Sequence, residues 1–132
     1  MNCLLDTHTL LWAAMRPAQL SHNARAAILD TANDVYVSVV TFWEVSLKFA
    51  LGKIELQGTT PEELPDAAMH MGFTLLALAP HDAATFHQLP RVQHKDPFDR
   101  MLVWQSICQN LTLLSKDPAL RQYQAHGLRV LW

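Results

Sequence analysis

The sequence contains little cysteine and no hydrophobic segment long enough to cross a membrane. Its only cysteines, Cys3 and Cys108, form no Cys-x-x-Cys motif, which excludes a disulfide scaffold and a cysteine-rich zinc module. Two thiols within apolar runs are typical of the reducing cytoplasm. The apolar runs fall well short of the ~20 residues of a membrane helix, and the first residues lack the basic region of a signal peptide. We therefore expect a soluble cytoplasmic protein that makes no membrane contact.

Neither sign of charge dominates, and glycine is scarce. Ten Lys and Arg residues against twelve Asp and Glu residues give a net charge of -2, which excludes a general polyanion-binding tail. Any nucleic-acid contact must therefore come from a local basic patch. Only four glycines occur in 132 residues, half of the residues are apolar, and there is no repeat or low-complexity linker. The composition predicts a single folded domain covering residues 1–132.

Short apolar segments alternate with helical sequence along the chain. We expect strands at residues 2–5, 35–39, 73–77, 111–115 and 128–131, with helices between them. Strands that are continuous apolar runs between helices predict a mostly parallel sheet with helices on both faces. The predicted fold class is therefore α/β, with three layers and about five strands. In such sheets, ligands bind beyond the carboxyl ends of the strands.

Acidic residues lie at or near these strand ends. Asp6 ends the first strand, and Asp117 follows the fourth. Glu44 is expected in the first turn of the helix after the second strand. Asp99 is expected in the first turn of the helix that leads into the fourth, with Asp96 on roughly the same side. Carboxylates crowded at one end of a sheet repel one another unless a cation is bound, and oxygen ligands suit Mg²⁺ or Mn²⁺ better than zinc.

Each acid also has a purely structural explanation. Asp6, Asp96 and Asp117 could cap the amino termini of helices, and Thr41-Phe-Trp-Glu44 matches a capping box. Thr60-Pro-Glu-Glu63 matches a second capping box. For any single acid the structural and functional explanations are about equally good. The acids taken together favour a metal site.

Four segments carry a recognisable ordered pattern. They are Asp6-Thr7-His8, Ser38-Val-Val-Thr-Phe-Trp-Glu44, His94-Lys-Asp-Pro-Phe-Asp-Arg100 and Leu113-Leu-Ser-Lys-Asp117. This set resembles a PIN domain, and more narrowly the VapC-type toxins of bacterial toxin–antitoxin pairs, over essentially the whole chain. The resemblance implies that the metal-binding, catalytic acids are Asp6, Glu44, Asp99 and Asp117. It implies supporting roles for Thr7, Asp96, Arg100 and Ser115.

The activity that this resemblance implies is that of a Mg²⁺-dependent endoribonuclease, with Mn²⁺ as the alternative ion. Such a toxin cuts RNA with a metal-activated water and arrests translation until a cognate small antitoxin protein occupies its site. Arg100 and Lys48 are candidates for phosphate contact, since an acidic site would otherwise repel RNA. The structural alternative for Lys48 is an i,i+4 pair with Glu44. Surplus apolar surface at residues 43–51, with Phe42 beside it, predicts a homodimer or a groove for a partner helix.

Other functional classes remain open. A phospho-receiver-like regulatory domain could have a similar sheet, although it needs a pair of early acids and Asp6 stands alone. An aspartyl-phosphate hydrolase is disfavoured, because His8 holds the position of its second Asp. A non-catalytic PIN-like binding module would keep the fold without the chemistry, and the complete set of acids argues against it. His8 and His94 adjoin the acids and are candidates for phosphate contact, whereas Trp12, Trp43 and Trp104 are expected in the core or at an interface.

Overall fold

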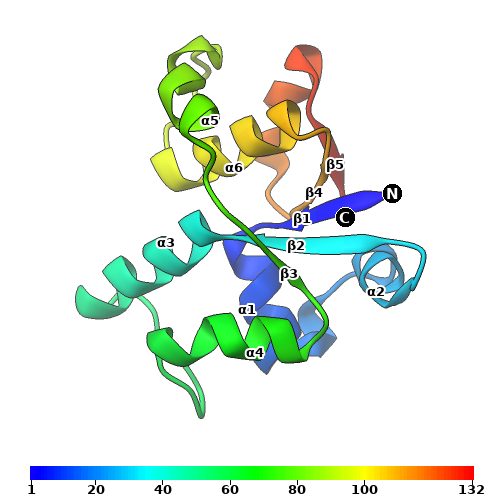
Figure 1. Cartoon of the computed structure of the whole chain (residues 1–132), viewed down its shortest axis with the longest axis vertical. Coiled ribbons are helices and arrows are strands. Elements are labelled where there is room, and N and C mark those ends of the chain that lie inside the picture. The colour runs from blue at the N-terminus through cyan, green and yellow to red at the C-terminus, as the bar shows by residue number, and fades with distance from the viewer.

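The computed structural model describes all 132 residues, which form three layers around a five-stranded sheet (Figure 1). The strands are Asn2–Leu5 (β1), Asp34–Ser38 (β2), Thr74–Leu76 (β3), Thr112–Leu114 (β4) and Arg129–Leu131 (β5). Their order is β3-β2-β1-β4-β5, and every neighbouring pair is parallel. The predicted α/β class is confirmed, and the sheet is entirely parallel. Its strand order differs from the 2-1-3-4-5 order of receiver domains, which removes that alternative.

Helices and 3-10 turns connect the strands. The α-helices are Thr7–Met15 (α1), His22–Leu29 (α2), Val39–Ala50 (α3), Leu64–His70 (α4), Pro80–Thr85 (α5) and Pro97–Cys108 (α6). The 3-10 segments are Pro17–Gln19 (η1), Pro61–Glu63 (η2), Phe86–Gln88 (η3) and Pro118–His126 (η4). None of these helices has both the length and the apolar character that a bilayer-spanning helix requires.

The sheet is covered on both faces, which explains why its strands are continuous apolar runs. In β1, Cys3 and Leu5 are fully buried in a cluster with residues of α1, α2 and α4. Leu4, between them, points to the opposite face and packs in a second cluster with residues of α6 and η4. Figure 1 shows α1, α2 and α4 on one side of the sheet and α5 and α6 on the other.

Helix α3 begins two residues earlier than predicted. Ser38, the last residue of β2, is its N-cap, and the Ser38 Oγ accepts a hydrogen bond from the Val40 N–H at 3.0 Å. Thr41 is fully buried inside the helix, with its hydroxyl 3.3 Å from that of Thr7. The predicted capping box from Thr41 to Glu44 is therefore wrong, because the chain passes directly from strand to helix at Ser38. Glu44 lies in the second turn of α3.

The second predicted capping box is also wrong. The Thr60 hydroxyl donates a hydrogen bond to Glu63 Oε1 at 2.9 Å, but the Thr60 side chain caps no backbone N–H group. An α-helix that began at Pro61 would need a hydrogen bond from the backbone nitrogen of Pro65, which proline lacks. A 3-10 turn, η2, therefore fills this segment, and α4 begins at Leu64.

Candidate metal and active site

The parallel sheet places three carboxylates around one pocket. Asp6 directly follows β1, Asp117 shortly follows β4, and Asp99 lies in the first turn of α6. All three line a cavity of about 420 Å³. The other lining residues are His8, Trp12, Lys116 and Pro118. Three of the four predicted acids thus meet where a parallel sheet binds its ligands.

Asp6 is held in place by the helix that it caps. Its Oδ1 accepts hydrogen bonds from the backbone N–H of Thr9 at 2.8 Å and from the Thr9 hydroxyl at 2.6 Å. The residue is 7% exposed, and this burial raises the pKa of its carboxyl group. Hydrogen bonds from Ser115 and Thr9, together with the charge of His8, oppose that rise. Asp6 is therefore both a helix cap and a wall of the pocket.

Asp117 is presented by a turn that Ser115 stabilises. The backbone N–H of Asp117 donates to Ser115 Oγ at 3.1 Å, and Asp117 Oδ1 accepts the N–H of Ala119 at 2.9 Å. Asp117 is thereby the N-cap of η4, as predicted. Ser115 is 3% exposed, so its hydroxyl acts on the buried side of this turn.

Asp96 and Asp99 occupy the start of α6. Asp96 is the N-cap, and its Oδ1 accepts two backbone N–H groups of the first turn at 2.9 and 3.1 Å. The pKa of Asp99 is raised to about 6, chiefly because the carboxyl group is buried. The negative charge of Asp96 raises this pKa further, followed by the charges of Glu44 and Asp6, whereas His94 lowers it. Ionised Asp99 is thus unfavourable in this site without a cation.

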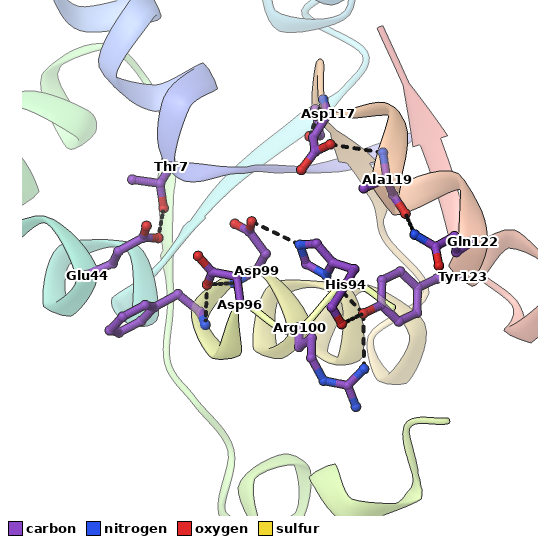
Figure 2. A network of polar contacts seen from close by, with 12 residues as sticks. Thr7, Glu44, His94, Asp96, Asp99, Arg100, Asp117, Ala119, Gln122 and Tyr123 are labelled. Carbon is purple, nitrogen blue, oxygen red and sulfur yellow. Dashed lines mark hydrogen bonds and ion pairs between the residues drawn. The ribbon is translucent and has the colours of Figure 1, made fainter. Parts of the chain in front are cut away.

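Glu44 faces the same region but is engaged by other partners. It is 2% exposed, and its Oε1 accepts a hydrogen bond from the Thr7 hydroxyl at 2.6 Å. Its Oε2 forms an ion pair with Lys48, one turn further along α3. Glu44 is not part of the lining of the 420 Å³ cavity. Figure 2 shows it on one side of Asp99, opposite His94.

Lys48, predicted as a phosphate contact, has its ammonium group among the acids. Burial lowers the pKa of Lys48, but Glu44, Asp96 and Asp99 together outweigh this effect and leave the pKa above its usual range. Its Nζ also lies 5.8 Å from the centre of the Phe98 ring. The predicted i,i+4 pair with Glu44 is therefore present in the structure.

His94 joins the acids as a further candidate ligand, a role that the sequence did not indicate. Ligand atoms of His94, Asp99 and Asp117 all lie within 4.8 Å of one another. The Nε2 atom of His94 is 3.4 Å from Asp99 Oδ2, and its Nδ1 is 3.0 Å from the hydroxyl oxygen of Tyr123. No spacing motif marks this group, because Asp117 and Tyr123 come from a distant part of the chain. The only signal in the sequence is that His94 lies beside the acidic segment of α6.

Arg100 points away from the carboxylates (Figure 2). Its Nη1 donates hydrogen bonds to the Tyr123 hydroxyl at 3.0 Å and to the Pro90 carbonyl at 3.2 Å, and its Nη2 donates to the Leu89 carbonyl at 3.3 Å. The guanidinium group also lies 5.5 Å from the centre of the Phe86 ring. Arg100 thus joins α6 to the segment before it and to η4, which is a supporting role.

Lys116 places a positive charge on the wall of the 420 Å³ cavity. Its Nζ lies 5.8 Å from the centre of the Trp12 ring, and that ring packs at 5.7 Å from both His8 and Trp132. Trp12 is therefore a half-buried wall of the pocket rather than part of the core. Trp43 is 64% exposed and packs edge-on against Phe98, so it also lies outside the core.

The sequence matches the model of the PIN domain family over residues 3–125. No curated protein matches the chain. Among solved structures, VapBC2 from Rickettsia felis bound to a promoter DNA fragment has a TM-score of 0.69 at 12% identity, covering 99% of this chain and 98% of that chain.

FitAcB from Neisseria gonorrhoeae has a TM-score of 0.63 at 22% identity, covering 100% of this chain and 97% of that chain. VapBC-1 from nontypeable Haemophilus influenzae has a TM-score of 0.62 at 16% identity, with 99% and 97% covered. At these identities the likeness establishes a shared fold. The match to the family model, which spans nearly the whole chain, establishes more: the chain belongs to the PIN domain family.

Proposed function

We propose that this chain is a Mg²⁺-dependent endoribonuclease, with Mn²⁺ as the alternative ion, and the toxin of a VapC-type toxin–antitoxin pair. Residues 1–132 would form a single PIN domain that acts in the cytoplasm and inhibits translation by cutting RNA. The observation that carries the proposal is the meeting of Asp6, Asp99 and Asp117 on one pocket. A cation held by these carboxylates would activate a water for attack on the phosphate, so hydrolysis there needs no side-chain nucleophile.

The residues of the pocket fit a hard divalent cation. The raised pKa of Asp99, about 6, reflects a negative charge that is unfavourable without a counter-ion. Carboxylate oxygens suit Mg²⁺ and Mn²⁺, and His94, which lies outside the lining of the cavity, brings an imidazole nitrogen within 4.8 Å of the ligand atoms of Asp99 and Asp117, a nitrogen that Mn²⁺ accepts more readily than Mg²⁺. A bound ion would supply an activated water and would neutralise charge on the phosphate. Glu44 would contribute charge from the other side of Asp99.

The remaining pocket residues can position an RNA strand. Lys116 places a positive charge beside Asp6 and Asp117, where an RNA phosphate must approach an otherwise acidic surface. Trp12 offers a partly exposed ring on which a base can stack. We assign the phosphate contact to Lys116 in preference to Arg100 and Lys48, because those two cations already have partners within the protein.

The test is cleavage of a single-stranded RNA and of a DNA of the same sequence, with Mg²⁺ or Mn²⁺ and then with excess EDTA. RNA should be cut only when metal is present, and adding metal back should restore cleavage. Asp117→Asn should reduce the rate at least about 100-fold, while Asp34→Asn, at an exposed strand end, should not. Cleavage that survives EDTA would contradict the metal mechanism, and equal cleavage of DNA would contradict the substrate. Metal binding without any cleavage would favour the non-catalytic binding module.

The proposed partners are a cognate small antitoxin and a second copy of this chain. Large apolar side chains of α3 are exposed, among them Trp43 at 64%, Leu47 at 41% and Phe49 at 44%. Trp43 also borders a small apolar cavity of about 170 Å³ with Phe98. Such surface favours a homodimer across α3. Light scattering should give twice the 14.9 kDa chain mass, and Trp43→Glu should reduce it to one chain.

A further inference from the structure

Asp99 has acidic neighbours on two sides, so the site offers two positions for a cation. On one side, ligand atoms of His94 and Asp117 lie within 4.8 Å of one another and of Asp99. On the other side lies Glu44, as Figure 2 shows. The negative charges of Glu44 and Asp96 both raise the pKa of Asp99, so this second position is acidic as well.

In this second position, Glu44 already has an ammonium group as its partner. Lys48 Nζ forms an ion pair with Glu44 Oε2, and Asp96 and Asp99 act on the same charge. The side chain of Lys48 is only 27% exposed, and that of Glu44 is 3% exposed. This pair therefore differs from a solvated i,i+4 pair on a helix surface, which contributes little and whose partners move freely.

Both carboxylate oxygens of Glu44 already have a partner within the protein. Thr7 donates a hydrogen bond to its Oε1 at 2.6 Å, and Lys48 binds its Oε2. Thr7 is 2% exposed and begins α1, so this arrangement joins two helices that are far apart in the sequence. The carboxylate is thus held toward Lys48 and outside the lining of the 420 Å³ cavity.

We propose that the Lys48 ammonium takes the place of a second divalent ion, so that each chain binds a single ion, on the His94 side of Asp99. The inference rests on the proposed metal-dependent function. Two-metal nucleases hold their ions about 3.5–4 Å apart, and the shared carboxylate has a metal on both sides. Here Asp99 has ligand atoms on one side and, on the other, a glutamate that is already paired with a side-chain cation. Lys48 is accordingly a positioning residue, which supplies positive charge where a second metal ion would otherwise bind.

The experiment counts Mn²⁺ bound to the purified chain, by titration followed with electron paramagnetic resonance and without RNA. Wild type should bind one ion. Lys48→Met should bind two, because Glu44, Asp96 and Asp99 then lack a cation. Its first site should also bind Mn²⁺ several-fold more tightly, because a nearby positive charge is gone.

Two control variants separate the charge of Lys48 from its other properties. Lys48→Arg keeps the charge and should return the count to one. Lys53→Met removes an exposed lysine with no ion pair a short distance along the chain and should also leave one ion. Thermal unfolding of each variant checks that the chain is folded, and Lys48→Arg tests the proposal even if Lys48→Met does not fold.

Two bound ions in the wild type would overturn the inference, as would two ions bound to Lys48→Arg. A single ion in both the wild type and folded Lys48→Met would overturn it while leaving the metal-dependent function intact. If the wild type bound no Mn²⁺ at all, the inference and the proposed function would fall together. These results are distinguishable because the measurement does not depend on cleavage.

Discussion

The hydroxyl group of Tyr123 contacts both the ring and the backbone carbonyl of His94. The Tyr123 O–H donates to the His94 carbonyl oxygen at 3.3 Å, and its oxygen lies 3.0 Å from His94 Nδ1. With the tyrosine proton on the carbonyl, the phenol oxygen can accept a hydrogen bond from a protonated Nδ1. The other ring nitrogen, Nε2, faces Asp99 at 3.4 Å from Oδ2. This arrangement leaves Nε2 as the nitrogen that could bind a metal ion, with Tyr123 as the outer partner that orients the ring.

Replacing His94 by alanine should therefore weaken Mn²⁺ binding more than Mg²⁺ binding, because imidazole nitrogen contributes more to the softer ion. We expect at least about a tenfold loss of Mn²⁺ affinity, and a smaller loss for Tyr123→Phe, which keeps His94 but not its partner. Isothermal titration with each ion measures both effects, with the exposed His126→Ala as the control. Equal losses for the two ions would contradict ligation by His94.

Asp99→Asn should abolish cleavage and yet stabilise the metal-free protein. At neutral pH the wild-type carboxylate is charged in a folded state that raises its pKa to about 6, so its ionisation weakens folding. A neutral amide removes this penalty, offset in part by ~0.3–1 kcal/mol lost at the amino terminus of α6. The net gain is on the order of 2 kcal/mol, which should raise the Tm by several degrees. Thermal unfolding in EDTA checks this, with Asp34→Asn as the control; a lower Tm for Asp99→Asn would contradict it.

The metal-free protein should become more stable as the pH falls from 7.5 to 5. Asp99 has a folded-state pKa of about 6, above its ordinary value of 3.8. The folded state therefore binds more protons than the unfolded state between these values, and stability decreases as the pH rises through them. Burial raises the pKa of Asp6 as well, which acts in the same direction.

Bound metal should oppose this pH effect, and the substitution Asp99→Asn should reduce it. Protons compete with Mn²⁺ for Asp99, so the rise in Tm caused by saturating Mn²⁺ should shrink as the pH falls. In Asp99→Asn, the increase in metal-free stability between pH 7.5 and 5 should be markedly smaller than in wild type. Unfolding curves in EDTA and in Mn²⁺ at several pH values measure both. An unchanged pH dependence in the variant would show that groups other than Asp99 cause the effect.

Arg100 and Lys116 should respond to mutation in opposite ways. Arg100→Ala loses hydrogen bonds to the Tyr123 hydroxyl and to the carbonyls of Leu89 and Pro90, and should destabilise the fold by about 1–3 kcal/mol without removing RNA affinity. Lys116→Ala, at an exposed position, should leave Tm unchanged and weaken RNA binding several-fold. Binding is measured at two salt concentrations in the non-cleaving Asp117→Asn background. Normal RNA affinity in Lys116→Ala would contradict its assignment to the phosphate.

Sequence alone was sufficient for the fold class and for most of the acidic site. Apolar strands that alternate with helices form a parallel sheet with helices on both of its faces. The carboxyl ends of parallel strands lie at the same edge of that sheet. Asp6 and Asp117 therefore meet because Asp6 directly follows β1 and Asp117 shortly follows the neighbouring strand β4. Asp99 joins them from the first turn of a helix, where the local pattern Asp96-Pro97 already marks the start.

The tertiary structure decided what each side chain contacts. The start of α3 depends on where β2 ends, so Ser38 is its cap, and Thr41 turns inward against Thr7. The positions of the Glu44 and His94 side chains depend on how α1, α3, α6 and η4 pack against one another. No local sequence pattern encodes that packing. The contacts of Glu44 with Thr7 and of His94 with Tyr123 join residues that are far apart in the sequence. Local propensities specify the elements, whereas such contacts exist only once both faces of the sheet are packed.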